Sequence, residues 1–222
     1  VIWATSMVAC GDADGAVTGN TRRFGASLEK IKQVVDVRDG EIMFGLNMVV
    51  HKGKTIFVGD TSVHEYPTSE QMAEMAISTA RVVRLFGFDP KVAFVSHSTF
   101  GQPLTSRTKH IRKAVDILKE KKVDFEFDGD MQPDVALNPE YEELYPFSKI
   151  VGKANILIMP GQHSAAISYK MMKTFGDTKV IGPLLIGLEL PIEIAPLRSS
   201  TSELINLASI AAYSADVIDY KK

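Results

Sequence analysis

Residues 96–101, SHSTFG, combine small hydroxyl side chains with a glycine directly after an apolar run that predicts a strand. Open α/β sheets bind their ligands at the carboxyl ends of parallel strands. Hydroxyl groups and exposed backbone amides at such a place suit phosphate or carbonyl oxygens. Ser98 and Thr99 are therefore candidates for ligand binding. The alternative is that the segment only connects a strand to a helix.

A second candidate lies at residues 198–201, RSST, which open a predicted helix. The unpaired N–H groups of a helix N-terminus, the positive end of its dipole and the guanidinium of Arg198 together form an anion site. Ser200 and Glu203, three residues apart, also form a capping box. Capping accounts for these residues without any ligand.

Other motifs fail on their spacing. Residues 53–55, GKT, end like a phosphate-binding loop, but Met48 stands where that loop requires a glycine. Residues 12–15, DADG, lack the remaining ligands and the glycine of a calcium loop, so we favour a tight turn over an acidic lining of an interdomain cleft. The histidines show no metal-ligand spacing, and no nucleophile stands in a recognisable elbow beside His97. The residues alone predict no metal site and no catalytic residue.

Composition excludes several classes of partner. The 222 residues carry 25 Lys+Arg and 27 Asp+Glu, a net charge of -2 that gives no electrostatic case for nucleic acid or an anionic membrane. Cys10 is the only cysteine, which excludes an intrachain disulfide and favours a reducing cytoplasm. No apolar run approaches the ~20 residues that span a bilayer. Residues 1–10 begin without Met and read as the middle of a buried element, so we expect a fragment whose N-terminal part is missing.

The elements that position the candidate residues follow from the apolar pattern. Alternation and β-branched residues predict strands near residues 42–50, 54–59, 91–97, 123–127, 154–159 and 183–187. Helical spacing predicts helices over residues 69–86, 105–121, 164–175 and 201–219. Thr68 and Gln71 form a capping box before the first helix, and Gly87 is a stop signal after it. Residues 51–54 predict a hairpin between the first two strands.

Strands that alternate with helices predict an α/β fold with three layers and a mostly parallel sheet, to which the hairpin adds an antiparallel pair. We expect one compact domain over residues 1–200. Residues 201–222 form a C-terminal helix that we expect to return to the missing N-terminal domain.

Seven short segments, in order along the chain, resemble phosphate acetyltransferases of the phosphate acetyl/butyryl transferase family. They are residues 11–15, 59–63, 67–71, 96–101, 128–130, 153–160 and 181–184. The chain most resembles the phosphotransacetylase-type domain at the C-terminus of bacterial NADP-dependent malic enzymes. This resemblance implies a fold similar to that of isocitrate and isopropylmalate dehydrogenases, and acetyl-CoA bound between two α/β domains.

The chain departs from the family where the family carries its catalytic groups. The resemblance places Pro196 and Leu197 at the family's Ser-Arg pair. At four further positions the chain has a different residue from the family. Glu203 replaces an Asp, and Glu29 replaces an Arg, although Arg22 and Arg23 are close by. Thr61 replaces a Cys, and Ala166 replaces an Asn of a motif whose Tyr169 and Lys170 are retained. Losing an Arg that acts in the transition state costs orders of magnitude in rate, whereas ground-state binding can survive.

The resemblance therefore implies an acetyl-CoA-sensing regulatory and oligomerisation domain of a cytoplasmic NADP-dependent malic enzyme, without acyltransferase activity of its own. NADP and a divalent metal are expected only in the missing malic domain. We expect that domain, acetyl-CoA and further copies of the chain as partners, and neither nucleic acid nor a membrane. The candidate ligand-binding residues are Thr61, Ser98, Thr99, Tyr169, Lys170, Arg198, Ser199, Ser200 and Glu203.

Two rivals remain. One is an active phosphate acetyltransferase that uses Arg198 and Ser199, shifted by two residues, in place of the lost pair. The other is an oligomerisation scaffold that binds no metabolite and pairs through the helices at residues 69–86 and 201–219.

Overall fold

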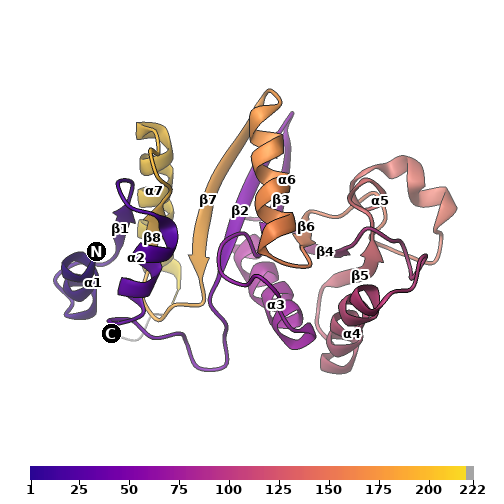
Figure 1. Cartoon of the computed structure of the whole chain (residues 1–222), viewed down its shortest axis with the longest axis horizontal. Helices are drawn as coiled ribbons and strands as arrows, with labels where there is room; N and C mark the ends of the chain where they lie inside the picture. Colours follow the sequence, from indigo (N-terminus) through magenta and orange to yellow (C-terminus); the bar gives the residue numbers. More distant parts are fainter. Residues whose placement is uncertain (219–222) are drawn as a thin grey trace. The chain divides into compact units, whose positions relative to one another are not determined.

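Strands and helices alternate along the chain in the computed structural model, which describes residues 1–218 (Figure 1). The chain divides into two units: unit 1 contains residues 1–47 and residues from 181 onward, and unit 2 contains residues 48–180. The expected division at residue 200 stays a prediction, and residues 219–222 of the expected C-terminal helix lie outside the described residues.

A six-stranded sheet has the order β5-β4-β6-β3-β2-β7. Its strands are β2 (Phe44–His51), β3 (Lys54–Gly59), β4 (Lys91–Val95), β5 (Glu126–Met131), β6 (Ile156–Ile158) and β7 (Thr178–Ile186). The pairs β3–β6, β6–β4 and β4–β5 are parallel. The expected α/β class with a mostly parallel sheet and one antiparallel pair is confirmed.

The hairpin between β2 and β3 also forms as predicted. Lys52 and Gly53 make its two-residue turn, with φ of 46° and 78°. Two-residue hairpin turns with positive φ at both positions match the twist of the strands they join. Glycine adopts such a φ without a steric penalty.

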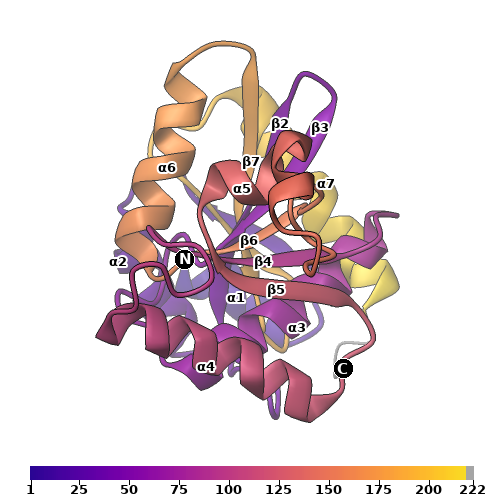
Figure 2. The same cartoon turned by 90° about the vertical axis from the view of Figure 1, so that its right-hand side faces the viewer.

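Helices cover both faces of the sheet in unit 2 (Figure 2). On one face lie α3 (Ser69–Leu85) and α4 (Ser106–Lys121), and on the other α5 (Pro133–Leu137) and α6 (Gln162–Thr174). The 3₁₀ helix η1 (Pro139–Leu144) follows α5. Both α3 and α4 begin with a capping box, at Thr68 as predicted and at Thr105.

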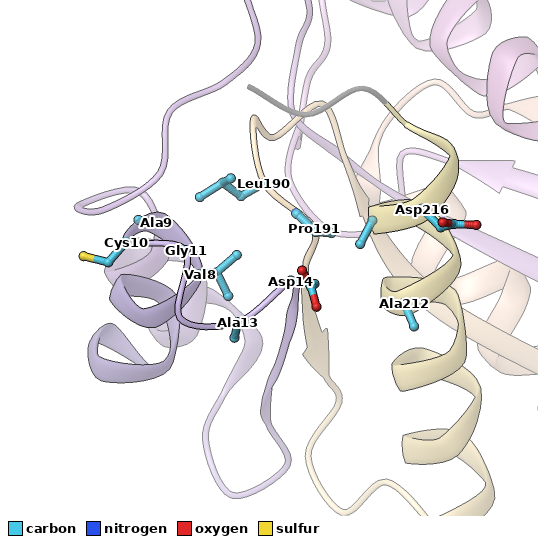
Figure 3. A pocket seen from close by; sticks show the side chains of 11 residues that line it. Val8, Ala9, Cys10, Gly11, Ala13, Asp14, Leu190, Pro191, Ala212 and Asp216 are labelled. Carbon is cyan, nitrogen blue, oxygen red and sulfur yellow. The ribbon is translucent and has the colours of Figure 1, made fainter. Parts of the chain in front are cut away.

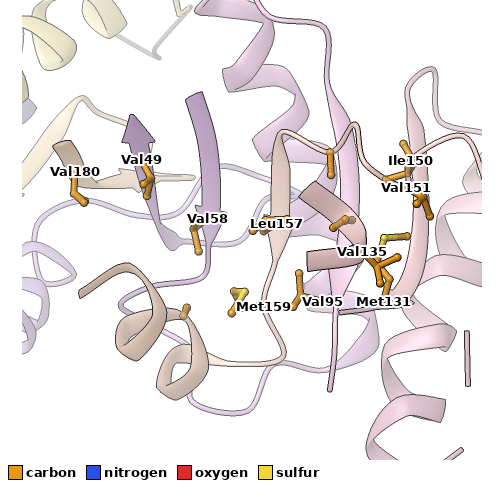
Figure 4. Packing of buried hydrophobic residues seen from close by; sticks show 14 residues of the cluster. Val49, Val58, Val95, Met131, Val135, Ile150, Val151, Leu157, Met159 and Val180 are labelled. Carbon is orange, nitrogen blue, oxygen red and sulfur yellow. The ribbon is translucent and has the colours of Figure 1, made fainter. Parts of the chain in front are cut away.

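Apolar side chains fill the space between the helices and the sheet. On the α3–α4 side, the predicted apolar face of α4 is buried: Ile111, Ala114, Val115 and Leu118. On the opposite side, a cluster joins β-strand valines such as Val58 and Val95 to Val135 of α5 and Met159 (Figure 4). This packing holds the carboxyl ends of the parallel strands in place.

Unit 1 contains a second, two-stranded sheet in which β1 (Ala16–Gly19) pairs in parallel with β8 (Ile192–Ala195). Its helices are α1 (Ile2–Ala9), α2 (Phe24–Ile31) and α7 (Thr201–Val217). The predicted capping box of Ser200 and Glu203 begins α7. No helix among residues 1–218 is long and apolar enough to cross a bilayer.

Candidate functional site

Two groups of loops follow the carboxyl ends of parallel strands, one group in each unit. In unit 2 they follow β3, β4 and β5, and they carry Thr61, Ser98 and Thr99. In unit 1 they follow β1 and β8, and they carry Arg198, Ser199 and Ser200. The remaining candidates are Tyr169 and Lys170 on α6 and Glu203 on α7.

Asp60 organises the loop after β3 in unit 2. Its buried carboxylate accepts hydrogen bonds from the backbone N–H groups of Ser62 (2.8 Å), Val63 (3.1 Å) and His64 (2.6 Å). The Nδ1 atom of His64 lies 2.7 Å from Asp60 Oδ2. A buried carboxylate is stable only when it is paired and hydrogen-bonded, and these contacts meet that need.

Asp130 has the same role for the loop after β4. Its buried carboxylate accepts hydrogen bonds from the Ser98 hydroxyl and from the Gly101 N–H, the latter at 3.0 Å. The Phe100 N–H donates to the Asp130 carbonyl oxygen at 2.7 Å. The loop of residues 96–101 is thus held to the end of β5, and the Ser98 hydroxyl is used to hold it.

The predicted hydroxyl residues of unit 2 therefore lie at the expected edge of the sheet, but they are buried. Thr61, Ser98 and Thr99 all lie below one tenth of full exposure. The Thr99 hydroxyl accepts a hydrogen bond from the Gln132 N–H at 3.3 Å. These side chains lie inside the two loops, so they do not offer exposed hydroxyls to a ligand.

Tyr169 and Lys170 lie on α6, a different element from the strand-end loops. Tyr169 packs partly against the apolar cluster of unit 2, and the Lys170 ammonium lies 5.9 Å from the centroid of its ring. Lys170 is exposed.

In unit 1, the loops after β1 and β8 hold one another. The Asn20 N–H donates to the Ala195 carbonyl oxygen and the Arg198 N–H donates to the Asn20 carbonyl oxygen, each at 3.0 Å. Gly19, with φ of 95°, permits this approach, because a Cβ atom at position 19 would collide with the Ala195 carbonyl oxygen. The N-termini of α2 and α7 consequently follow neighbouring strand ends.

Positive charge and unpaired polar atoms gather around these two strand ends. Arg22, Arg23 and Arg198 are exposed on the loops. Three buried oxygens, Thr18 Oγ1, Asn20 Oδ1 and Ser27 Oγ, have no hydrogen-bond partner among the described residues. Two helix N-termini together with guanidinium groups are an arrangement suited to phosphate or carboxylate. None of these three residues was predicted. Thr18 lies on β1, which has only four residues, all of intermediate burial, and therefore lacks the alternation that marks a strand.

The other predicted residues of this site cap α7. Glu203 Oε2 lies 2.7 Å from the Ser200 N–H and 2.9 Å from the Ser200 hydroxyl. The Ser199 hydroxyl donates to the Pro196 carbonyl oxygen at 2.9 Å. Of the four predicted residues in unit 1, Arg198 and Ser200 are exposed, and the Ser200 hydroxyl is bonded to Glu203.

Glu193 is a buried acid that the candidate list missed. It lies on β8 and accepts a hydrogen bond from the Leu185 N–H at 2.9 Å. Burial raises the pKa of its carboxyl to about 8, although the hydrogen bond from Leu185 acts in the opposite direction. A single Glu between Ile192 and Ile194 in an apolar run is the sequence signal that could have found it.

Unit 1 also contains a cavity of about 740 Å³ between the end of α1, the turn before β1 and the last turns of α7 (Figure 3). Its lining is mostly apolar, with the carboxylates of Asp14 and Asp216. Asp14 belongs to the acidic turn of residues 12–15. No group of three or more His, Cys, Asp or Glu within residues 1–218 is placed to hold a metal ion.

Comparison with known proteins gives consistent matches over nearly the whole chain. Residues 1–212 match the family model described as "Phosphate acetyl/butaryl transferase". An NADP-dependent malic enzyme of Rhizobium meliloti (strain 1021) is 46% identical over 96% of this chain and 28% of its own length. A phosphate acetyltransferase of Bacillus subtilis (strain 168) is 30% identical over 96% of this chain and 67% of its own length. The chain therefore spans less than a third of the malic enzyme.

Solved structures agree with these sequence matches. A phosphotransacetylase from Streptococcus pyogenes superposes with a TM-score of 0.91 at 29% identity, over 97% of this chain and 67% of that one. The expected similarity of this fold to that of isocitrate and isopropylmalate dehydrogenases stays a prediction.

Proposed function

The chain belongs to the Phosphate acetyl/butaryl transferase family, and we propose that it is the acetyl-CoA-binding regulatory domain of an NADP-dependent malic enzyme. The domain has no acyltransferase activity of its own in this proposal. The 46% identity to a malic enzyme, against 30% to a phosphate acetyltransferase, supports the choice of parent protein.

The observation that carries the proposal is the chemistry at the end of β8. Pro196 and Leu197 follow this strand, at the positions where the family resemblance puts a Ser-Arg pair. Neither side chain can hold a proton or a charge. Acyl transfer between acetyl phosphate and a thiol needs a base for the thiol and cationic donors for the developing negative charge. Removing one such donor typically costs about 3 kcal/mol of transition-state stabilisation.

Binding has weaker requirements than catalysis, and the strand ends of unit 1 retain features that support it. Arg22, Arg23 and Arg198 are exposed on the loops that lead into α2 and α7, and cationic side chains on loops beside helix N-termini favour phosphate groups such as those of a CoA ester. Interactions that are equal in the ground state and the transition state contribute affinity without contributing rate. A site with these groups and without the Ser-Arg pair binds and does not turn over.

The remaining parts of the proposal concern the parent protein. In it, malate is oxidatively decarboxylated to pyruvate and CO₂, and the NADP site and divalent-metal site lie outside this chain. The parent enzyme is cytoplasmic and assembles as a homo-oligomer. Because linkage is reciprocal, ligands of the malic part must change acetyl-CoA affinity by the same factor by which acetyl-CoA changes theirs.

Calorimetric titration of acetyl-CoA into the intact protein tests this function, with free CoA as the matched ligand. We expect saturable binding that prefers acetyl-CoA. We also expect an approximately tenfold loss of affinity in Arg198→Ala, about 1.4 kcal/mol. The rate of malate turnover should then depend on acetyl-CoA. The proposal fails if acetyl-CoA does not bind, or if the malate rate is the same at every acetyl-CoA concentration.

An active phosphate acetyltransferase is the second candidate function. The similarity to phosphotransacetylases at 29% and 30% identity favours it, and Arg198 with Ser199 would replace the lost pair. The Ser199 hydroxyl, however, donates to the Pro196 carbonyl oxygen in this structure. Formation of acetyl-CoA from acetyl phosphate and CoA, lost in Arg198→Ala, would establish this second function in place of the first.

A further inference from the structure

His64, in the loop between β3 and α3, has one ring nitrogen committed to Asp60. Its Nδ1 atom lies 2.7 Å from Asp60 Oδ2. The Asp60 carboxylate is fully buried, and an ionised carboxylate can only accept hydrogen bonds. The hydrogen-bond network therefore assigns the hydrogen to Nδ1. In the neutral imidazole the other nitrogen, Nε2, then carries a lone pair and acts as an acceptor.

This acceptor has no partner in the part of the chain that the structure describes. The hydrogen bonds of His64 are made by its backbone and by Nδ1, and none is made by Nε2. The side chain is 19% exposed, so a ligand can reach the ring although most of it is buried. A polar atom with few neighbouring waters and no protein partner gains free energy when a ligand supplies a donor.

The position of the ring is fixed by contacts on both sides of residue 64. The His64 N–H donates to Asp60 Oδ2 at 2.6 Å, and the His64 carbonyl oxygen accepts from the Gln162 N–H at 2.9 Å. The chain also passes close to Gly161, because a Cβ atom at position 161 would collide with the Glu65 carbonyl oxygen. A group that is held in place before its ligand arrives loses little conformational freedom on binding.

The imidazole is larger than the contact with Asp60 requires. The side-chain amide of an Asn at position 64 could donate to Asp60 in the same way, because its nitrogen stands in for Nδ1. The imidazole extends further and presents Nε2. It does so just beyond the carboxyl end of β3, a parallel strand, and open α/β sheets bind their ligands at such ends.

The surrounding charges favour a neutral donor as the ligand. Asp60 is an anion beside the ring, and Glu65, the next residue, lies 3.3 Å from His163. Phosphate and carboxylate oxygens are acceptors and negatively charged, so they do not suit a lone pair next to an anion. No group of three or more His, Cys, Asp or Glu in residues 1–218 is placed to hold a metal ion. An amide N–H or a hydroxyl fits this place.

We propose that unit 2 binds an amide-bearing, uncharged arm of a ligand, and that His64 Nε2 accepts a hydrogen bond from its amide N–H. The pantetheine arm of acetyl-CoA has this chemistry, since it carries amide groups and no charge. The choice of this ligand rests on the proposed function. The contact itself belongs to unit 2, and it assigns a binding role to a residue that the sequence did not single out.

Titration of S-acetylpantetheine into the intact protein, followed by ligand-observed NMR, tests the contact. We expect His64→Asn to lower the affinity about tenfold, because Asn keeps the donor to Asp60 and has no counterpart of Nε2. His64→Gln can place its amide oxygen where Nε2 lies, so its affinity should stay within about threefold of wild type. His163→Asn, at an exposed histidine next to the same loop, is the matched control and should bind as wild type.

A purely structural role for His64 predicts the opposite order of the two variants. Asn would then bind S-acetylpantetheine as wild type does, and Gln, which cannot reach Asp60 in the same way, would not; this result overturns the proposal. An equal midpoint of thermal unfolding for wild type and His64→Asn checks that the loop stays folded.

Failure of this inference differs from failure of the proposed function. Arg198→Ala should weaken acetyl-CoA binding and leave S-acetylpantetheine binding unchanged, because the arm carries no phosphate. If S-acetylpantetheine binds through His64 but acetyl-CoA never changes malate turnover, the contact stands and the regulatory function fails. If acetyl-CoA binds equally well to wild type and to His64→Asn, and S-acetylpantetheine does not bind, the contact is wrong and the proposed function stands.

Discussion

Single residues in this protein are held in protonation and hydrogen-bonding states that burial in the folded protein sets. Glu193 is the strongest case, because its carboxyl is buried beside one backbone donor, the Leu185 N–H. Burial raises its pKa from 4.5 to about 8. Between these two pH values the folded state keeps a proton that the unfolded state releases. Stability therefore falls as the pH rises through this window, by at most about 1.4 kcal/mol per pH unit.

Glu193→Gln should remove this pH dependence. The Gln side chain is neutral at every pH, and its carbonyl oxygen can still accept from the Leu185 N–H. We expect the variant to gain stability relative to wild type as the pH rises from 5 to 9, by more than about 1 kcal/mol at the upper end. Urea unfolding at several pH values measures the difference. Glu143→Gln, at an exposed position, is the control. Parallel pH profiles for wild type and Glu193→Gln would contradict a protonated Glu193.

At the scale of elements, helix boundaries were the most predictable feature. The predicted helices at residues 69–86 and 105–121 correspond to α3 (Ser69–Leu85) and α4 (Ser106–Lys121). A capping side chain, an apolar face and a stop signal lie within one short segment, so the local sequence is enough to define where such a helix begins and ends. The end strands of the sheet were less predictable: β5 and β7 were predicted at residues 123–127 and 183–187. Such strands have one unpaired edge and tolerate polar residues, which weakens the apolar pattern.

The cap of α4 can be tested separately from its packing. The Thr105 hydroxyl accepts a hydrogen bond from the Thr108 N–H at 3.2 Å. We expect Thr105→Ala to lower the free energy of unfolding by about 1 kcal/mol, the usual cost of removing such a cap. Ser106→Ala, one position further and exposed, should change it by less than about 0.5 kcal/mol. Equal effects of the two substitutions in urea unfolding would show that the Thr105 cap is not formed.

At the scale of the whole molecule, the proposed effector should act as a stabiliser. A ligand that binds the folded state alone, present at 100 times its dissociation constant, adds about 2.7 kcal/mol to the free energy of unfolding. We expect acetyl-CoA to raise the midpoint of thermal unfolding of the intact protein, and free CoA at the same concentration to raise it less. Arg198→Ala should reduce the shift caused by acetyl-CoA. A midpoint independent of acetyl-CoA would contradict binding.

The candidate site was only partly predictable from sequence. Residues 96–101 and 198–201 lie at the ends of parallel strands, as their small and hydroxyl residues indicated. The sequence did not reveal that Ser98 is bonded to Asp130, because Asp130 is 32 positions away. It also did not reveal the loop contact between Asn20 and Arg198, which depends on the pairing of β1 with β8.

The sequence by itself determined the family, the α/β class, the hairpin and the capped helices, since each depends on residues that are close in the chain or occur in a fixed order. Only the tertiary structure decided which polar groups are buried, which strand ends are neighbours, and that the outer face of α6 is left exposed. Burial and strand pairing depend on contacts between residues far apart in the chain. They set the protonation of Glu193, commit the Ser98 hydroxyl to Asp130, and leave Ile167, Met171 and Phe175 exposed.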